Sequence, residues 1–196
     1  DLDRETRLAH LQMMKEQGQR MQALVEDMLT LTNLESNDYP LKREAFDAPE
    51  LIDGIFHAAQ ALSGGRHTIT LEMDGPQTLY GSADEIRTAF TNLVTNAIRY
   101  TPDGGSIRLS WKTANEGPRF SVTDTGIGIE AKHIPRLTQR FYQVDKSRSR
   151  QVNGTGLGLS IVRHILLRHE GYLDIESEPG KGSTFSAQFS RRILVP

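Results

Sequence analysis

The sequence predicts an α+β fold of two layers, in which a mixed sheet is covered on one face by helices and preceded by a long N-terminal helix. Three patterns predict it. Apolar residues fall at helical spacing from about residue 8 to residue 34, helical segments and strands share the chain after a break, and the strands are apolar at every second position. Such alternation is typical of a sheet with one buried face.

The first segment is expected to form one long helix with an apolar stripe. The stripe consists of Leu11, Met14, Met21, Val25 and Met28. These residues follow the spacing of a heptad, and a helix that carries such a stripe must bury it against a partner. Periodicity alone leaves two partners open, the same domain or another helix in a bundle or dimer. The turn and breaker residues at 36–40 mark a domain boundary.

The middle of the chain is expected to supply two helices and three strands. Asp47 can cap a helix that runs to about Leu62, and Ser82 opens a second helix with its apolar residues on one face. Strands are expected around residues 69–73, 107–111 and 120–122, where apolar and polar residues alternate. These elements supply most of the predicted sandwich.

The last part of the chain combines a helix, two strands and a long connection. The helix is expected over residues 157–169, with Gly171 as its C′ residue, and the strands over 173–176 and 183–189. Residues 128–154 are basic and fit neither helical nor strand spacing. Long connections of this kind are commonly functional or disordered. Beside glycine-rich turns, this one suggests a lid over an anion.

Composition bounds the class of protein. With 196 residues, 37% of them hydrophobic, the chain can bury one sizeable core. The net charge of −2 gives no global indication of nucleic acid or an anionic membrane as partner. Because the chain has no cysteine, disulfides and thiolate metal sites are excluded. No apolar run is long enough to cross a bilayer, and no signal peptide is recognisable.

The first candidate site lies on the helix that Ser82 opens. Asn92 and Asn96 are four residues apart and share a helix face, and Arg99 lies on the same side. A carboxamide oxygen can ligate Mg²⁺, which keeps several waters and takes other ligands from phosphates. These residues could therefore bind a triphosphate, although paired asparagines on a helix can also be solvated or capping residues.

The second candidate is Asp124-Thr125-Gly126-Ile127-Gly128-Ile129, directly after a predicted strand. An ionised aspartate only accepts hydrogen bonds, so it can bind the exocyclic amino group of adenine, whereas guanine presents a carbonyl oxygen there. Gly126 and Gly128 would let the backbone approach a flat base closely. The alternative is an ordinary turn from strand to loop.

Two further glycine motifs follow. Gly154-Thr155-Gly156-Leu157-Gly158 opens the last helix, where free backbone N–H groups form a ready anion site. It is not a P-loop, because no Gly-Lys-Ser/Thr follows at the required spacing. It is not a dinucleotide fingerprint either, because its glycines come late in the chain. Gly180-Lys181-Gly182-Ser183-Thr184 could equally be a hairpin turn with a basic tip.

The order of these motifs resembles the ATP-binding domain of sensor histidine kinases. An asparagine-rich helix, Asp-x-Gly-x-Gly, a basic loop with Arg140-Phe141-Tyr142, Gly-x-Gly-x-Gly and Gly-x-Gly-x-Thr follow one another along the chain. The wider family includes type II topoisomerases, heat-shock chaperone ATPases and mismatch-repair ATPases. The resemblance covers roughly residues 46–189 and implies a mixed sheet with helices on one side.

The resemblance implies ATP and Mg²⁺ as cofactors. Asn96 would ligate the metal that bridges the phosphates, and Asn92 would support the helix and polarise the site. Arg99 stands where a lysine is common, so it keeps the charge but not the point-donor geometry. Arg148 or Arg150 would reach the γ-phosphate from the lid.

The resemblance also implies which residues surround the base and close the site. Asp124 would bind the adenine amino group. The base would be walled or backed by Tyr100, Gly126, Gly128, Ile129 and Thr184. The remaining nucleotide-binding residues lie on the lid and its hinge, namely Tyr142, Gly154, Thr155, Gly156, Leu157 and Gly158.

One position distinguishes the branches of this family. The hydrolysing relatives place a glutamate, as the base that activates water, where this chain has Asn92. An amide does not take up a proton at neutral pH, so water attack should be slow and the γ-phosphate kept for another acceptor. This favours a protein-histidine kinase. The alternatives are a non-catalytic nucleotide-binding regulatory module and a hydrolysing ATPase.

The resemblance also predicts the domain organisation. Residues 1–36 resemble the second helix of the dimerisation and histidine-phosphotransfer hairpin, 37–45 a linker and 46–196 the ATP-binding catalytic domain. The acceptor histidine of the family lies in a His-Glu-x-x-x-Pro pattern on the first hairpin helix, which none of the six histidines here matches. We therefore expect a fragment without its phosphoacceptor.

For the intact protein the resemblance implies a homodimer, a response regulator receiver domain as partner and no nucleic acid. It also implies that the chain is the cytoplasmic portion of a sensor anchored in the inner membrane by parts that this sequence does not contain.

Overall fold

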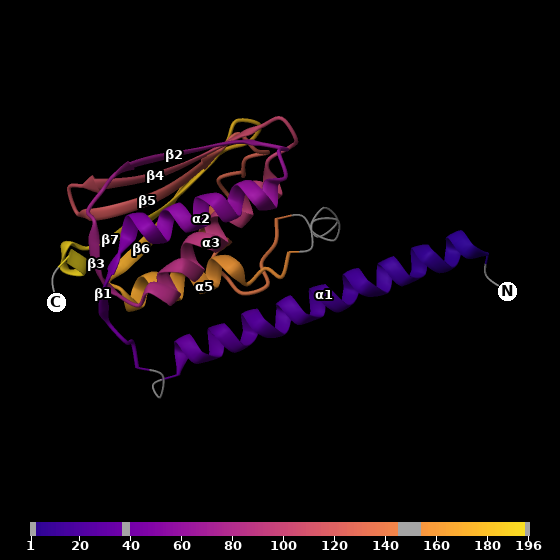
Figure 1. Ribbon diagram of the computed structural model, residues 1–196, viewed down its shortest axis with the longest axis horizontal. Helices are drawn as coiled ribbons and strands as arrows, with labels where there is room; N and C mark the ends of the chain where they lie inside the picture. The colour runs from indigo at the N-terminus through magenta and orange to yellow at the C-terminus, as the bar shows by residue number, and fades with distance from the viewer. Residues whose placement is uncertain (1–2, 37–39, 145–153, 195–196) are drawn as a thin grey trace.

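A mixed sheet, a layer of helices on one of its faces and one long projecting helix make up the structure. The computed structural model describes residues 3–36, 40–144 and 154–194. In Figure 1 the helices α2, α3 and α5 lie together beneath the sheet, and α1 runs along the far side of this helical layer. The predicted two-layer α+β fold with a long N-terminal helix is confirmed.

Within the described residues the main sheet has five strands in the order β2-β4-β5-β7-β6. Its strands are β2 (Thr68–Asp74), β4 (Ser106–Ala114), β5 (Gly117–Asp124), β6 (Gly171–Glu178) and β7 (Gly182–Phe189). The pair β2–β4 is parallel and the other three pairs are antiparallel, which makes the sheet mixed. The short strands β1 (Glu44–Asp47) and β3 (Thr78–Gly81) form a separate antiparallel pair.

The helices of the sandwich begin where the sequence predicts. The side chain of Asp47 accepts the N–H of Glu50 at 2.8 Å and caps α2 (Ala48–Ser63). The side chain of Ser82 accepts the N–H of Glu85 at 3.3 Å and caps α3 (Ala83–Tyr100). These bonds satisfy amide groups that have no partner inside the helix. Both predicted helix starts are therefore confirmed.

Aromatic packing fixes α3 on the sheet. The ring of Phe90 stacks on that of Phe120 with 4.0 Å between centroids, and Trp111 and Phe189 surround it. All four side chains are fully buried. Truncating an aromatic side chain at such a site typically costs about 3–5 kcal/mol. Because this packing fixes one face of α3 on the sheet, the polar residues on its other face have a fixed position relative to the end of β5.

The long helix α1 (Arg4–Glu35) packs on the sandwich through its C-terminal part. Leu31 and Leu34 are buried, and α1 contacts α5 (Gly158–Arg168). The predicted stripe is exposed further toward the N-terminus, with Met14 at 71% and Met21 at 67%. The first alternative is confirmed for the end of the helix, which packs on its own domain, whereas a partner for the exposed part of the stripe stays a prediction.

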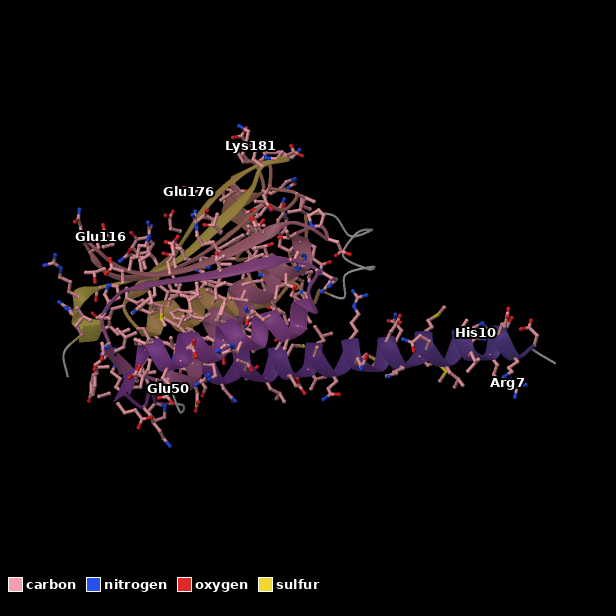
Figure 2. All side chains as sticks on the ribbon, turned by 45° about the horizontal axis from the view of Figure 1, so that its top comes forward. Arg7, His10, Glu50, Glu116, Glu176 and Lys181 are labelled. Carbon is pink, nitrogen blue, oxygen red and sulfur yellow. The ribbon has the colours of Figure 1, made fainter. Side chains whose placement is uncertain are left out.

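The N-terminal part of α1 projects away from the sandwich. In Figure 2 the labelled side chains Arg7 and His10 lie on this free stretch, far from Glu176 on β6 and from Glu116 in the turn between β4 and β5. Among the described residues, none of the helices combines the length and the apolar character needed to span a membrane.

Two details differ from the prediction. The helix α5 ends at Arg168, and the left-handed residue that follows it is Glu170 with φ 57°, not Gly171. Gly171 begins β6, where its backbone runs against the carbonyl of Gln188 and leaves no room for a side chain. The strands β1 and β3 were not predicted, and β1 includes residues 44 and 45 of the expected linker.

Candidate functional site

A cavity of about 510 Å³ opens between α3, the end of β5, the glycine-rich start of α5 and the side of α1. The predicted site residues that line it are Asn92, Asn96, Arg99, Tyr100, Asp124, Gly128, Ile129, Tyr142, Gly154, Thr155, Gly156 and Gly158. In the sequence these residues extend from position 92 to position 158. The fold thus brings most of the predicted site together around one cavity of a size that suits a nucleotide.

Asp124 is the buried acid of the cavity. It is the last residue of β5 and only 6% exposed. The backbone N–H of Gly126 donates to its Oδ1 at 2.8 Å. Burial raises the pKa of Asp124 above its ordinary value of 3.8, and hydrogen bonds from the backbone of Gly126 and Ser183 oppose this shift. A carboxylate held in this way is oriented to accept a further hydrogen bond from a ligand.

Two glycines shape the backbone next to this carboxylate. A Cβ at Gly126 would lie 2.6 Å from Oδ1 of Asp124, so any larger residue at position 126 would clash with the carboxylate. Gly126 itself is not among the lining residues. Gly128 has φ +66° and runs against the backbone of Glu178, so a side chain there would be both strained and obstructed. The backbone of residues 126–128 can therefore lie close to a ligand that Asp124 binds.

The polar face of α3 supplies the amide groups. Nδ2 of Asn92 donates to the carbonyl of Thr88 at 3.0 Å, which fixes the orientation of its carboxamide. Among the described residues the side chain of Asn96 makes no hydrogen bond, so its carboxamide is available to a ligand. Arg99 lies one turn further along the helix and is exposed. The cavity thus presents two amides and one cation along a single face of α3.

The glycine-rich segment 154–158 forms the wall next to α3. Gly156 has φ +76°, and an added Cβ would lie 3.0 Å from the backbone of Phe141. Gly158 begins α5, and a Cβ there would lie 2.6 Å from Oδ1 of Asn92. Leu157 is fully buried and belongs to the core rather than to the cavity lining. Its side chain anchors the segment while its glycine neighbours allow the close approach to α3.

Tyr142 is oriented by two neighbours. Its hydroxyl lies 2.6 Å from Nδ1 of His133, and the guanidinium carbon of Arg136 lies 4.4 Å from the centre of its ring. A cation over an aromatic face is attracted by the π electrons. Neither His133 nor Arg136 was among the predicted site residues, because their effect on the cavity passes through Tyr142.

One predicted residue has to be corrected. Thr184 does not line the cavity, because it lies on the other face of the sheet, where its hydroxyl bonds that of Thr123 at 3.0 Å. Side chains alternate along a strand, so the cavity instead receives Ser183 and Phe185. The apolar character of Phe185 was the signal that could have identified this face from the sequence.

The sequence also gave no indication that α1 contributes to the site. Ala23 and Asp27 of α1 line the cavity, and the hydroxyl of Thr155 donates to Oδ2 of Asp27 at 2.6 Å. Periodicity assigns a residue to a helix face but not to a distant partner. Arg148 and Arg150, expected to reach a terminal phosphate, lie outside the described residues.

Comparison with known protein families identifies the domain. The family model described as histidine kinase-, DNA gyrase B-, and HSP90-like ATPase matches residues 81–193. This range takes in the α3 asparagines, the Asp124 turn and the glycine-rich segment.

Curated relatives extend the similarity along most of the chain. The chain is 50% identical over 184 residues to the phosphate regulon sensor protein PhoR of Pseudomonas aeruginosa, covering 93% of this chain and 42% of that protein. It is 37% identical over 182 residues to the protein of the same name from Haemophilus influenzae, covering 93% and 43%. The chain therefore spans less than half the length of these relatives.

Solved structures share the fold. The histidine kinase AdeS of Acinetobacter baumannii aligns with a TM-score of 0.74 at 23% identity, over 98% of this chain and 87% of that one. The full-length ShkA crystal structure in complex with AMPPNP aligns with a TM-score of 0.78 at 26% identity, over 97% of this chain and 40% of that one. Both alignments include the long helix as well as the sandwich.

Proposed function

This chain belongs to the histidine kinase-, DNA gyrase B-, and HSP90-like ATPase family, as the ATPase-type domain found in sensor histidine kinases, and from that premise we propose what its cavity does. The cavity binds ATP·Mg²⁺ and positions the γ-phosphate for in-line transfer to a histidine on a separate segment. The phosphate is then relayed to a response regulator.

The observation that carries this proposal is the position of Asp124 and Asn96 around one cavity. Asp124 ends a strand of the sheet and Asn96 lies on α3, and both line the same 510 Å³ space. The carboxylate supplies an acceptor for the amino group of adenine, and the carboxamide supplies an oxygen for a metal beneath the phosphates. The glycine segment 154–158 offers backbone amides at the start of α5 to the phosphates.

The donor set fits Mg²⁺ bound together with a nucleotide. Among the described residues no cluster of three or more His, Cys, Asp or Glu side chains could hold a metal alone. Mg²⁺ commonly keeps several waters and takes phosphate oxygens, so one protein oxygen from Asn96 is a sufficient anchor. Bound there, the metal would neutralise charge on the phosphates, while Asn96 and Arg99 orient them.

The amide at position 92 supports transfer over hydrolysis. Nδ2 of Asn92 is held by Thr88 and its carboxamide has no basic site at neutral pH, so this residue cannot activate water as a glutamate would. The γ-phosphate is thereby kept for a histidine whose own ring nitrogen is the nucleophile. Catalysis then consists mainly of positioning and charge neutralisation.

The proposal also includes the oligomeric state and the location of the intact protein. The exposed stripe of α1, with Met14 and Met21 among its members, suits a homodimer of the intact protein. The similarity to phosphate regulon sensor proteins supports a membrane-anchored sensor of phosphate supply, with this chain on the cytoplasmic side.

The test is phosphate transfer to a histidine-bearing segment. The chain is mixed with ATP labelled on its γ-phosphate and with a helical hairpin that carries the His-Glu-x-x-x-Pro pattern. We expect acid-labile, base-stable phosphate on the histidine, and a lower rate at limiting ATP for Asp124→Asn. Thr184→Ala, on the other face of the sheet, is the matched control and should transfer at the wild-type rate.

Two other results would each support a different function. Bound ATP without transfer would identify a regulatory nucleotide-binding module. Steady release of free phosphate, at the expense of transfer, would identify a hydrolysing ATPase.

A further inference from the structure

A carboxylate of α1 binds the glycine-rich wall of the cavity. Oδ2 of Asp27 accepts the hydroxyl proton of Thr155 at 2.6 Å, in a partly buried setting, and both residues line the cavity. They are 128 positions apart in the sequence, and Asp27 belongs to the helix that precedes the sandwich. The contact therefore joins the long helix directly to the segment proposed to hold phosphates.

The only proton of the Thr155 hydroxyl is used in this arrangement. Its single proton goes to Asp27, and its oxygen accepts the backbone N–H of Leu157 at 3.2 Å. A hydroxyl has one proton to donate. A phosphate oxygen that approached Thr155 could not receive this proton while Asp27 holds it.

Among the residues that the structure describes, the charge of Asp27 is also uncompensated. No basic side chain pairs with it among the described residues, whereas Glu35 of the same helix contacts Arg140 and lies 3.0 Å from Nε2 of His164. An unpaired carboxylate in a partly buried cavity repels a second anion more strongly than it would in bulk water. A triphosphate in the cavity would meet both this repulsion and the occupied hydroxyl.

We propose that Asp27 is an internal competitor of the nucleotide's phosphates for Thr155, so that docking of α1 and binding of ATP oppose each other. The inference rests on the proposed ATP site and adds its regulation. With α1 docked, the affinity for ATP is lowered. By thermodynamic reciprocity, ATP bound at the glycine segment weakens the docking of α1 by the same factor. The contact between Leu34 and α5 would then loosen when ATP binds.

Calorimetric titration of the whole chain with ATP·Mg²⁺ and with adenosine tests this competition. We expect Asp27→Asn to bind ATP·Mg²⁺ at least about fivefold more tightly than the wild type, the lower end of typical coupling between sites. Adenosine has no phosphate, so its affinity should stay unchanged. The matched control is Glu26→Gln, which removes the same charge one residue away, where the side chain is exposed and accepts a hydrogen bond from Gln22. It should bind both ligands like the wild type.

A double-mutant cycle separates the competition for the hydroxyl from a general charge effect. In Thr155→Val, which keeps the shape of the side chain and removes the hydroxyl, Asp27→Asn should raise the ATP affinity by much less than in the wild type. An equal gain in both backgrounds would overturn the competition. Weaker ATP binding by Asp27→Asn would overturn it as well and make Asp27 part of the metal site.

Hydrogen exchange gives an independent measure. Saturating ATP·Mg²⁺ should speed exchange in residues 23–35, and saturating adenosine should not. Unchanged or slower exchange with bound ATP contradicts the inference and leaves the proposed ATP site intact. Failure of the wild type and the Glu26→Gln control to bind either ligand would contradict the ATP site itself.

Discussion

Replacing Asp124 with asparagine is expected to raise the stability of the empty domain and to weaken ATP binding. The side chain is 6% exposed, and burial raises the pKa of its carboxyl above 3.8. A raised pKa means that the native state holds the ionised form at a cost in free energy at neutral pH. Asparagine has nearly the same shape and no charge, so this cost disappears while Gly126 N–H keeps an oxygen acceptor.

The loss in binding follows from the strength of the hydrogen bond to adenine. A hydrogen bond to a charged group contributes about 1.5–3 kcal/mol and one between neutral groups about 0.5–1.5 kcal/mol. The substitution should therefore cost about 1–2 kcal/mol of binding free energy, which is roughly a 5- to 30-fold lower affinity. Discrimination against GTP should weaken too, because an amide can pair with either base edge.

Two measurements check this prediction, calorimetry with ATP and GTP and urea unfolding of the empty chain. The pH dependence has a definite sign. As pH falls from the raised pKa of Asp124 toward 3.8, the native state takes up a proton at this carboxyl before the unfolded state does, so the free energy of unfolding increases. Over the same pH range ATP affinity is lost, because the protonated carboxyl is a poorer acceptor for the adenine amino group. Asp124→Asn should lack both changes. Wild-type affinity for ATP in this variant, or lower stability of the empty variant, would refute the reasoning.

Three further predictions concern single positions. Gly158→Ala should lower ATP affinity at nearly unchanged stability, because the new Cβ, 2.6 Å from Oδ1 of Asn92, displaces the end of that side chain and leaves the backbone of α5 in place; calorimetry and urea unfolding measure the two effects. Burial lowers the pKa of His169 below 6.5, so as pH falls below 6.5 the unfolded state takes up a proton at this residue before the native state does, and the free energy of unfolding decreases. The midpoint of urea unfolding should fall less over this pH range in His169→Gln than in the wild type. Ser183→Ala should weaken ATP binding, whereas Thr184→Ala on the opposite face should leave it within about twofold, as calorimetry would show.

Local chemistry explains which parts of the fold could be predicted. Asp47 and Ser82 cap their helices as expected, because capping depends on residues within one turn. The apolar face of α3 was predicted from periodicity and is buried. The strands β1 and β3, each four residues long, are too short for an alternating pattern to be recognised.

The parts that were missed depend on geometry across the chain. Gly171 looked like a helix terminator, but its lack of a side chain serves the close approach to Gln188, and Glu170 takes the left-handed conformation instead. Thr184 was chosen over Ser183 because a motif does not state which strand face meets the cavity. Asp27 could not be found at all, because its partner Thr155 is distant in sequence.

The central claim is that the cavity between α3 and the glycine segment is an adenine-nucleotide site that uses Mg²⁺. Titrating the chain with ATP, ADP and GTP, each with and without Mg²⁺, measures this most directly. We expect binding of ATP and ADP, a gain in affinity with Mg²⁺ that is larger for ATP, and much weaker binding of GTP. Equal affinities for GTP and ATP, or no heat from any adenosine nucleotide, would contradict it.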